Sequence, residues 1–216
     1  MATVALSGEM LARSEFDAKH VPELAQRIQR SARLMKSMVE DLLGYTRTQL
    51  GKGLPITHNW CDISEVLDGA IADATATHPG TRFELQTTGE LAACYDGTRL
   101  HQLFVNLLVN AAQYGAKSHP VEIAATASED WNCVRVTNQG TAMSEAAMRS
   151  IFEPLVQLSE DDATDTRPKT SLGLGLFIAR EIAEGHGGKV TVRSDDTHGT
   201  TFTVELPREF GCRPPQ

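Results

Sequence analysis

The longest periodic pattern of apolar positions lies in residues 21–49. Apolar residues recur there at steps of three and four, which predicts one long helix with a heptad seam. The seam consists of Val21, Leu24, Ile28, Ser31, Met35, Met38, Leu42 and Tyr45. A shorter apolar stretch that ends near Arg13 predicts a preceding helix, and therefore a helical hairpin. One hairpin has too little core to stand alone, so the pattern favours a homodimer joined in a four-helix bundle. A hairpin folded back on its own domain is the alternative.

Glycine and proline divide the chain after this hairpin. Gly51 and Gly53 break the helix and Pro55 follows, so we predict a hairpin domain at 1–50 and a second domain at 55–210. Residues 211–216 are expected to form a tail.

The second domain alternates between two kinds of apolar pattern. Period-two alternation predicts strands at 82–86, 91–95, 121–127, 133–137, 189–193 and 201–206. The first two flank a glycine-containing turn, and the last two are expected to pair as a hairpin. Helices are predicted from a cap at Asp62 or Ser64 to Thr77, from a cap at Asp96 to Gly115, and over 175–185. This order indicates an α/β sandwich with helices on one face of a mixed, mostly antiparallel sheet, so the whole chain is α+β.

Composition and charge exclude several function classes. The net charge is −8 with no cluster of Lys and Arg, so nucleic acid is an unfavourable partner. No apolar run approaches the roughly 18–20 residues of a membrane span, and no signal peptide is visible. The cysteines lie far apart, which argues against zinc and favours reduced thiols in the cytosol; they are Cys61, Cys94, Cys133 and Cys212. We therefore expect a cytoplasmic chain without membrane contact, although its abrupt start fits a piece of a longer, membrane-anchored receptor.

The candidate chemistry begins with two asparagines in the apolar helix at 97–114. Asn106 and Asn110 are four residues apart, so they lie on one face of the helix, one turn from each other. An amide offers a carbonyl oxygen and two N–H donors, which suits a hard cation beside a polyanion. Burying two amides without partners would cost a few kcal/mol. The pair therefore indicates a ligand site, with amides satisfied by the core backbone as the alternative.

Three further segments extend this picture. The first, 136–143, is a strand that ends in Asn138 and a glycine turn. The second, 151–155, precedes an acidic stretch at 159–170 that is typical of a loop. The third, 171–181, carries Gly173 and Gly175 just before a helix, where the backbone can approach a ligand and the helix N-terminus favours phosphate. Such a glycine pair is weak evidence by itself and is otherwise a tight loop-to-helix joint.

In this order, the four segments resemble the ATP-binding domain of bacterial sensor histidine kinases, within the ATPase superfamily shared with gyrase, Hsp90 and MutL. The hairpin resembles the dimerisation and phosphotransfer domain of the same kinases. The resemblance implies ATP and Mg2+ as cofactors and transfer of the γ-phosphoryl group to a His, then to the Asp of a response regulator. The resemblance also implies Asn110 as the Mg2+ ligand, with Asn106 hydrogen-bonding nearby. Asn138 would accept a hydrogen bond from adenine, and Thr201 would support that contact. The implied nucleotide-binding set is Asn106, Asn110, Gln113, Tyr114, Asn138, Gly140, Met143, Gly173, Leu174, Gly175, Leu176 and Thr201.

The chain also departs from the family pattern. Asn138 stands where an Asp is usual, and Ala142 stands where a second Gly is usual. Gln113 and Gln157 replace basic residues that many relatives direct at phosphate, and the loop after them is acidic. These changes predict weaker nucleotide binding than is usual for the family.

The phosphate acceptor is the larger departure. His20 precedes Val21 and Pro22 in a predicted turn and does not match the family's acceptor motif. The other six histidines are expected to be structural or solvent-facing, so we assign no catalytic residue and expect ATP binding without autophosphorylation. A pseudokinase or scaffold with a degenerate pocket is the main alternative. An anti-sigma-factor-type kinase acting on Ser is a weaker one, because those proteins lack the hairpin.

Overall fold

The structure is a computed structural model that describes residues 25, 28, 32, 35, 38, 39, 42–51, 53–156, 173–208 and 212. The chain divides into two compact units, residues 1–43 and 44–216. The described residues of the first unit are helical, but most of the predicted hairpin, including His20, lies outside the described residues, and so does the predicted bundle. Within the part of the chain that the structure describes, no helix has both the length and the apolarity of a membrane span.

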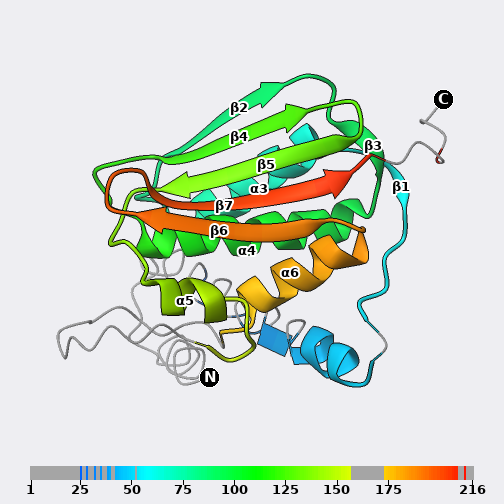
Figure 1. The fold of residues 1–216 in the computed structure, drawn as a ribbon, viewed down its shortest axis with the longest axis horizontal. Helices are drawn as coiled ribbons and strands as arrows, with labels where there is room; N and C mark the ends of the chain where they lie inside the picture. The colour runs from blue at the N-terminus through cyan, green and yellow to red at the C-terminus, as the bar shows by residue number, and fades with distance from the viewer. Residues whose placement is uncertain are drawn as a thin grey trace, which may run out of the picture. The chain divides into compact units, whose positions relative to one another are not determined.

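The second unit is built on one five-stranded sheet (Figure 1). Its strands, in spatial order, are β2 (Phe83–Thr88), β4 (Val121–Ala127), β5 (Trp131–Asn138), β7 (Gly199–Pro207) and β6 (Lys189–Asp195). β2 and β4 pair in parallel, and every other neighbouring pair is antiparallel. The predicted mixed, mostly antiparallel sheet is therefore confirmed, as is the closing β6–β7 hairpin.

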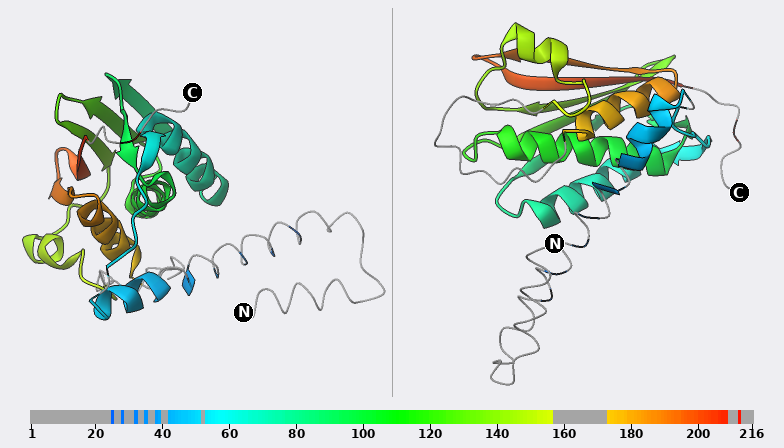
Figure 2. Two further views of the ribbon diagram at one scale, coloured as in Figure 1. Left: turned by 90° about the vertical axis from the view of Figure 1, so that its right-hand side faces the viewer. Right: turned by 90° about the horizontal axis from the view of Figure 1, so that it is seen from below.

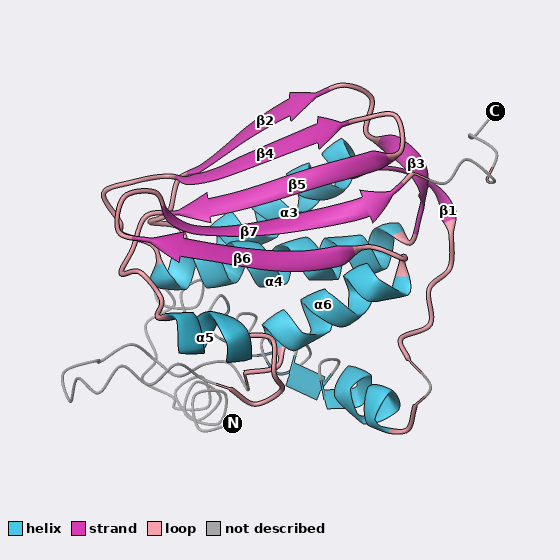
Figure 3. Ribbon diagram, in the orientation of Figure 1, coloured by secondary structure: helices cyan, strands magenta, loops and turns pink. Residues whose placement is uncertain are grey.

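Helices cover one face of this sheet (Figures 2 and 3). They are α3 (Ile63–Thr77), α4 (Gly97–Tyr114) and α6 (Gly175–Gly185), with the short α5 (Glu145–Ser150) beyond the sheet's β6 edge. α4 packs against both α3 and α6, so it occupies the middle of the helical layer. The core forms between this layer and the alternate residues of the strands that face it, such as Val134 and Val136 of β5.

Side-chain caps fix the helix ends that the sequence predicts. The carboxylate of Asp62 accepts a hydrogen bond from the Ser64 amide (2.8 Å), and Asp96 accepts one from the Arg99 amide (3.1 Å). α4 ends at Tyr114, where the Gly115 amide donates to the carbonyl of Ala111 (2.8 Å). These contacts satisfy backbone groups that a helix end leaves without intrahelical partners.

The predicted strands at 82–86 and 91–95 both form, but they belong to different sheets. β3 (Ala92–Tyr95) pairs antiparallel with β1 (Asn59–Asp62) in a separate two-stranded sheet, and β1 was not predicted because four residues are too few for a clear alternation.

The expectation that all the cysteines are reduced thiols was wrong. Cys94 and Cys212 form a disulfide, across a sequence separation of 118 residues that spacing cannot reveal.

The second unit begins before the predicted boundary at Gly51. Residues 42–49 are helical, and from Gly44 onward they belong to the second unit. A Cβ at Gly44 would lie 2.9 Å from a methyl carbon of Ile178 on α6, so the glycine allows a close approach of the two helices. Tyr45, which the heptad pattern places on the seam, packs edge-on against Phe177 with ring centroids 5.8 Å apart.

Candidate functional site

The two asparagines of α4 have different environments. Asn106 is partly buried, and its Nδ2 donates a hydrogen bond to the carbonyl of Gly175, the first residue of α6 (3.0 Å). Its amide is therefore engaged in positioning the start of α6 against α4. For this asparagine, a backbone partner accounts for the buried amide.

Asn110 lies one turn further along the same face of α4. It is also partly buried, but its side chain makes no hydrogen bond to any residue that the structure describes. A partly buried amide without a protein partner forfeits hydrogen bonds that water or a ligand would supply. Of the two asparagines, Asn110 is thus the one placed to contact a ligand.

The start of α6 adds unsatisfied backbone donors beside this pair. Leu174 is the N-cap residue and provides no side-chain hydrogen bond to the first turn. The first N–H groups of a helix carry a partial positive charge and favour phosphate when no side chain caps them. Gly173 has a φ of +69°, and a Cβ there would lie 2.7 Å from the carbonyl oxygen of Val156, so only glycine fits this turn. Leu174 itself is fully buried.

The end of β5 meets the end of α4 through two glycines. A Cβ at Gly140 would overlap the carbonyl oxygen of Tyr114, and a Cβ at Gly115 would lie 3.3 Å from the Cβ of Asn138. The amide of Ala116 donates to the carbonyl of Gln139, which ties the two segments together. This close approach brings the side chain of Asn138, which is only 3% exposed, against the C-terminal turn of α4.

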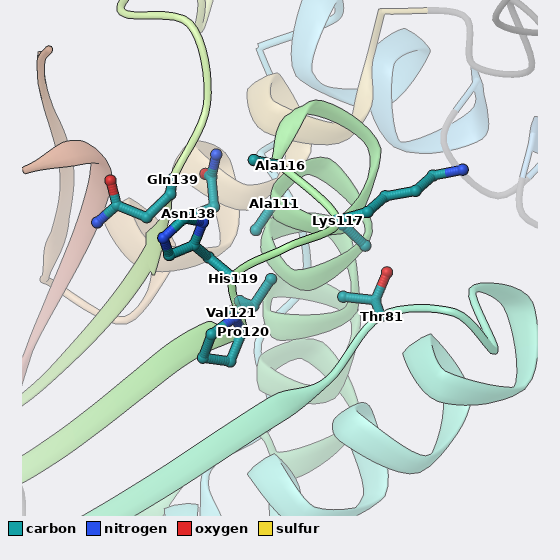
Figure 4. A pocket seen from close by; sticks show the side chains of 11 residues that line it. Thr81, Ala111, Ala116, Lys117, His119, Pro120, Val121, Asn138 and Gln139 are labelled. Carbon is teal, nitrogen blue, oxygen red and sulfur yellow. The ribbon is translucent and has the colours of Figure 1, made fainter.

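Asn138 faces a small hollow between α4 and the sheet (Figure 4). The hollow has about 250 Å³ of empty space, which includes space open to solvent, and it has room for about one water molecule. Its lining consists of Thr81, Ala111, Ala112, Gly115, Ala116, Lys117, His119, Pro120, Val121, Asn138 and Gln139.

Thr200, and not the predicted Thr201, is the threonine beside Asn138. Asn138 pairs with Thr200 across β5 and β7, so both side chains lie on the helix-covered face. The Thr200 hydroxyl is 2.7 Å from the hydroxyl of Ser194. Thr201 faces the other side of the sheet, where its hydroxyl lies 3.0 Å from that of Thr137. The signal was available in the sequence: Thr200 shares its parity with the apolar Phe202 and Val204 of the same strand.

The remaining predicted residues surround this site less directly. Gln113 and Tyr114 follow Asn110 on α4, with Gln113 partly buried and Tyr114 40% exposed. Met143 packs against the core, and its amide donates to the Ser194 hydroxyl (2.9 Å). Leu176 also packs against the core. Gln157 and the acidic stretch at 159–170 lie outside the described residues.

The histidines of the second unit match the structural or solvent-facing role expected of them where the structure describes them. His186 is 4% exposed and accepts a hydrogen bond from the Asp96 amide at Nε2 (3.0 Å), so Nδ1 carries the proton that it shares with the carbonyl of Ile182 (2.8 Å). No cluster of three His, Cys, Asp or Glu side chains suited to a metal exists among the described residues. A cation held at this site would therefore use amide oxygen and ligand oxygens.

Comparison with known proteins places this site in a family. A family model described as histidine kinase-, DNA gyrase B- and HSP90-like ATPase matches residues 95–209, which is more than half of the chain. The chain belongs to this ATPase family. The match begins just before α4 and ends just after β7, so it contains α4, the end of β5, the start of α6 and all the lining residues of the hollow except Thr81.

Relatives narrow the assignment. The chain is 30% identical over 207 residues to a bacteriophytochrome of Pseudomonas aeruginosa, covering 96% of this chain and 28% of that protein. It is 33% identical over 114 residues to the sensor protein SrrB of Staphylococcus aureus, covering 53% of this chain and 19% of that protein. The chain spans less than a third of the length of these relatives.

Solved structures show the same fold. The mycobacterial sensor histidine kinase MprB matches with a TM-score of 0.60 at 22% identity, covering 71% of this chain and 99% of that one. Full-length ShkA, solved in complex with AMPPNP, matches with a TM-score of 0.69 at 21% identity, covering 99% of this chain and 47% of that one.

Proposed function

We propose that this chain binds Mg2+–ATP between α4, the end of β5 and the start of α6. In the whole protein, the ATP γ-phosphoryl group would pass to a His of the dimerisation domain and then to the Asp of a response regulator. The protein would act as a homodimer through its helical hairpin. The observation that carries this proposal is the partly buried Asn110 amide, which has no partner among the described residues and lies one turn from the residue that anchors α6.

Each end of the nucleotide would meet a different part of the site. The Asn110 oxygen would coordinate Mg2+, which prefers oxygen ligands and completes its shell with phosphate oxygens and water. The unsatisfied N–H groups at the start of α6 would face the phosphates. Asn138 and Thr200, at the end of the sheet, would face the base, with Gly140 and Gly115 keeping the backbone close. Asn106 would position α6 and would not contact the nucleotide itself.

The chain's own histidines do not fit the role of acceptor in this proposal. The buried His186 uses both ring nitrogens in hydrogen bonds to the backbone. His101 lies on α4 beside Asp73 of α3, with 3.4 Å between Nε2 and the carboxylate, within the helical layer and away from the end of β5. Phosphoryl transfer depends mainly on positioning and on metal electrostatics, so the nucleotide site can exist without the nucleophile. We expect this chain to bind ATP without phosphorylating itself.

Calorimetric titration with Mg2+ and a non-hydrolysable ATP analogue tests the proposal. We expect binding by the wild-type chain and, for Asn110→Ala, an affinity at least about 100-fold lower, because the metal loses its protein ligand. Asn59→Ala is the matched control, since Asn59 is an exposed amide on β1, outside the site. Normal binding by Asn110→Ala would show that the metal ligand is assigned to the wrong residue.

The competing proposal is a scaffold that binds nucleotide poorly and acts through its dimer. Two observations favour it: Asn138 carries no charge, and the hollow that it lines has room for only about one water molecule. No binding at millimolar ligand in the same titration would replace the kinase proposal with the scaffold.

A further inference from the structure

We infer that the site accepts 6-oxopurine nucleotides, such as those of guanine and hypoxanthine, as well as adenine nucleotides, because an amide and not a carboxylate faces the base. This inference rests on the proposed nucleotide site and widens the class of nucleotides that the site would bind. The residue that decides it is Asn138.

The Asn138 side chain is buried, and no hydrogen bond to a described residue fixes the orientation of its amide. It is 3% exposed, lines the hollow and makes no hydrogen bond to any described residue. A Cβ at Gly140 would lie 3.4 Å from the Nδ2 atom of Asn138. Because glycine has no Cβ, there is room around this amide. The neighbouring Thr200 hydroxyl is paired with Ser194 at 2.7 Å. No described partner therefore fixes which way the amide oxygen and nitrogen point.

An amide that can rotate by half a turn is complementary to two kinds of purine edge. Adenine presents an amino donor at C6 and an acceptor at N1, and a 6-oxopurine presents an acceptor at C6 and a donor at N1. A rotation of the Asn138 amide by half a turn exchanges its donor and acceptor, so it can pair with either edge. An ionised carboxylate only accepts hydrogen bonds, and it would face the 6-oxo group with two like-charged oxygens. The usual Asp of the family therefore selects the 6-amino group, whereas Asn138 does not.

The rest of the hollow supplies no other carboxylate to restore that selection. None of the lining residues is acidic. Gln139 points away from Asn138 in Figure 4, and its Nε2 donates to the carbonyl of His198 (3.3 Å). Lys117 and His119 are exposed on the rim. Recognition of the C6 position would therefore depend on Asn138.

Calorimetry with Mg2+ and either ADP or IDP tests this inference, since the two bases differ in the donor and acceptor pattern at C6 and N1. For the wild-type chain we expect the two Kd values to agree within about fivefold. For Asn138→Asp we expect IDP to bind at least about tenfold more weakly than ADP, because the carboxylate still accepts a hydrogen bond from the 6-amino group of adenine but repels the 6-oxo oxygen of hypoxanthine. Gln86→Glu adds the same charge at an exposed residue of β2, outside the hollow, and should leave the ratio unchanged.

The outcomes separate this inference from the proposed function. If the wild-type chain binds ADP more than about 50-fold tighter than IDP, or if Asn138→Asp leaves the ratio unchanged, the inference is wrong while the nucleotide site stands. If neither nucleotide binds the wild-type chain, the proposed function itself falls. ADP binding by Asn138→Asp shows that this variant is folded, so loss of IDP binding alone cannot come from misfolding.

Discussion

Two asparagines lie on the same face of β5, at opposite ends of the strand, and they illustrate two uses of a buried amide. Asn132 is fully buried, and its Nδ2 donates to the carbonyl of Leu91 and to the hydroxyl of Tyr95, each at 3.0 Å. Asn138 is nearly as buried but has no partner among the described residues, and it faces a hollow. Burial alone does not distinguish them. The hydrogen-bond partners of the nitrogen do: they tie Asn132 to the core, and their absence among the described residues is consistent with the ligand contact proposed for Asn138.

The helical layer repeats this contrast. Asn106 and Asn110 share one face of α4, yet Asn106 bonds to the Gly175 carbonyl while Asn110 has no described partner. Each pair therefore consists of one amide that bonds within the fold and one without a described partner. Asn110 and Asn138, the two amides proposed to contact the nucleotide, lie toward the same end of the second unit, where α4 and β5 both end.

The largest effect should separate the two amides of β5. Asn132→Ala removes two buried hydrogen bonds and leaves a cavity, so we expect it to lower the free energy of unfolding by about 2–3 kcal/mol. Asn138→Ala removes an amide without a described partner, so we expect a change within about 0.5 kcal/mol. Urea unfolding of both variants measures this difference. Equal losses would show that Asn138 also stabilises the core, and the contrast would be wrong.

A second comparison concerns the two amides of α4. Asn106→Ala removes the bond to the Gly175 carbonyl, so we expect a loss of about 1 kcal/mol in the free energy of unfolding. Because the start of α6 is then less firmly held, nucleotide binding should weaken about tenfold. Asn110→Ala should show the opposite pattern, with unchanged stability and lost binding. Urea unfolding and calorimetry on both variants test this. A stable Asn106→Ala that binds no nucleotide would show that Asn106 contacts the ligand directly.

The sequence predicted the elements that carry these residues better than their partners. The bounds of α3, α4 and α6 follow from local signals, because Asp62, Asp96 and Gly115 are caps or stops beside a clear apolar period. The strand pairings could not follow in the same way. β2 lies beside β4, and β3 lies beside β1, through contacts that no local pattern encodes.

The candidate site shows the same limit. The asparagine spacing places Asn106 and Asn110 on one face of α4, but it cannot show that Asn106 has a partner on α6, 69 residues away. The family motif points to Thr201, whereas the alternation of β7 puts Thr200 on the face of Asn138. That Asn138 has no partner among the described residues is a property of the packed structure, and its role in binding stays a prediction.

The smallest effect concerns the part of α6 that contacts residues 44–50 and not the site. Burial, with a further contribution from Glu184, raises the pKa of Glu181, despite Arg180 and a hydrogen bond from Thr48. A carboxyl whose pKa is raised on folding favours the protonated folded state. Stability is therefore full below the usual pKa of glutamate and falls as the pH rises through the raised pKa. Glu181→Gln removes this loss, so the variant should gain on the wild-type chain between about pH 4 and about pH 7. Because the side chain is partly exposed and screened by solvent, the gain should stay below about 1 kcal/mol. Urea unfolding at both pH values measures this gain in stability, and Glu84→Gln, which changes an exposed glutamate on β2, is the control. A gain of the same size in the control would assign the effect to net charge and not to the burial of Glu181.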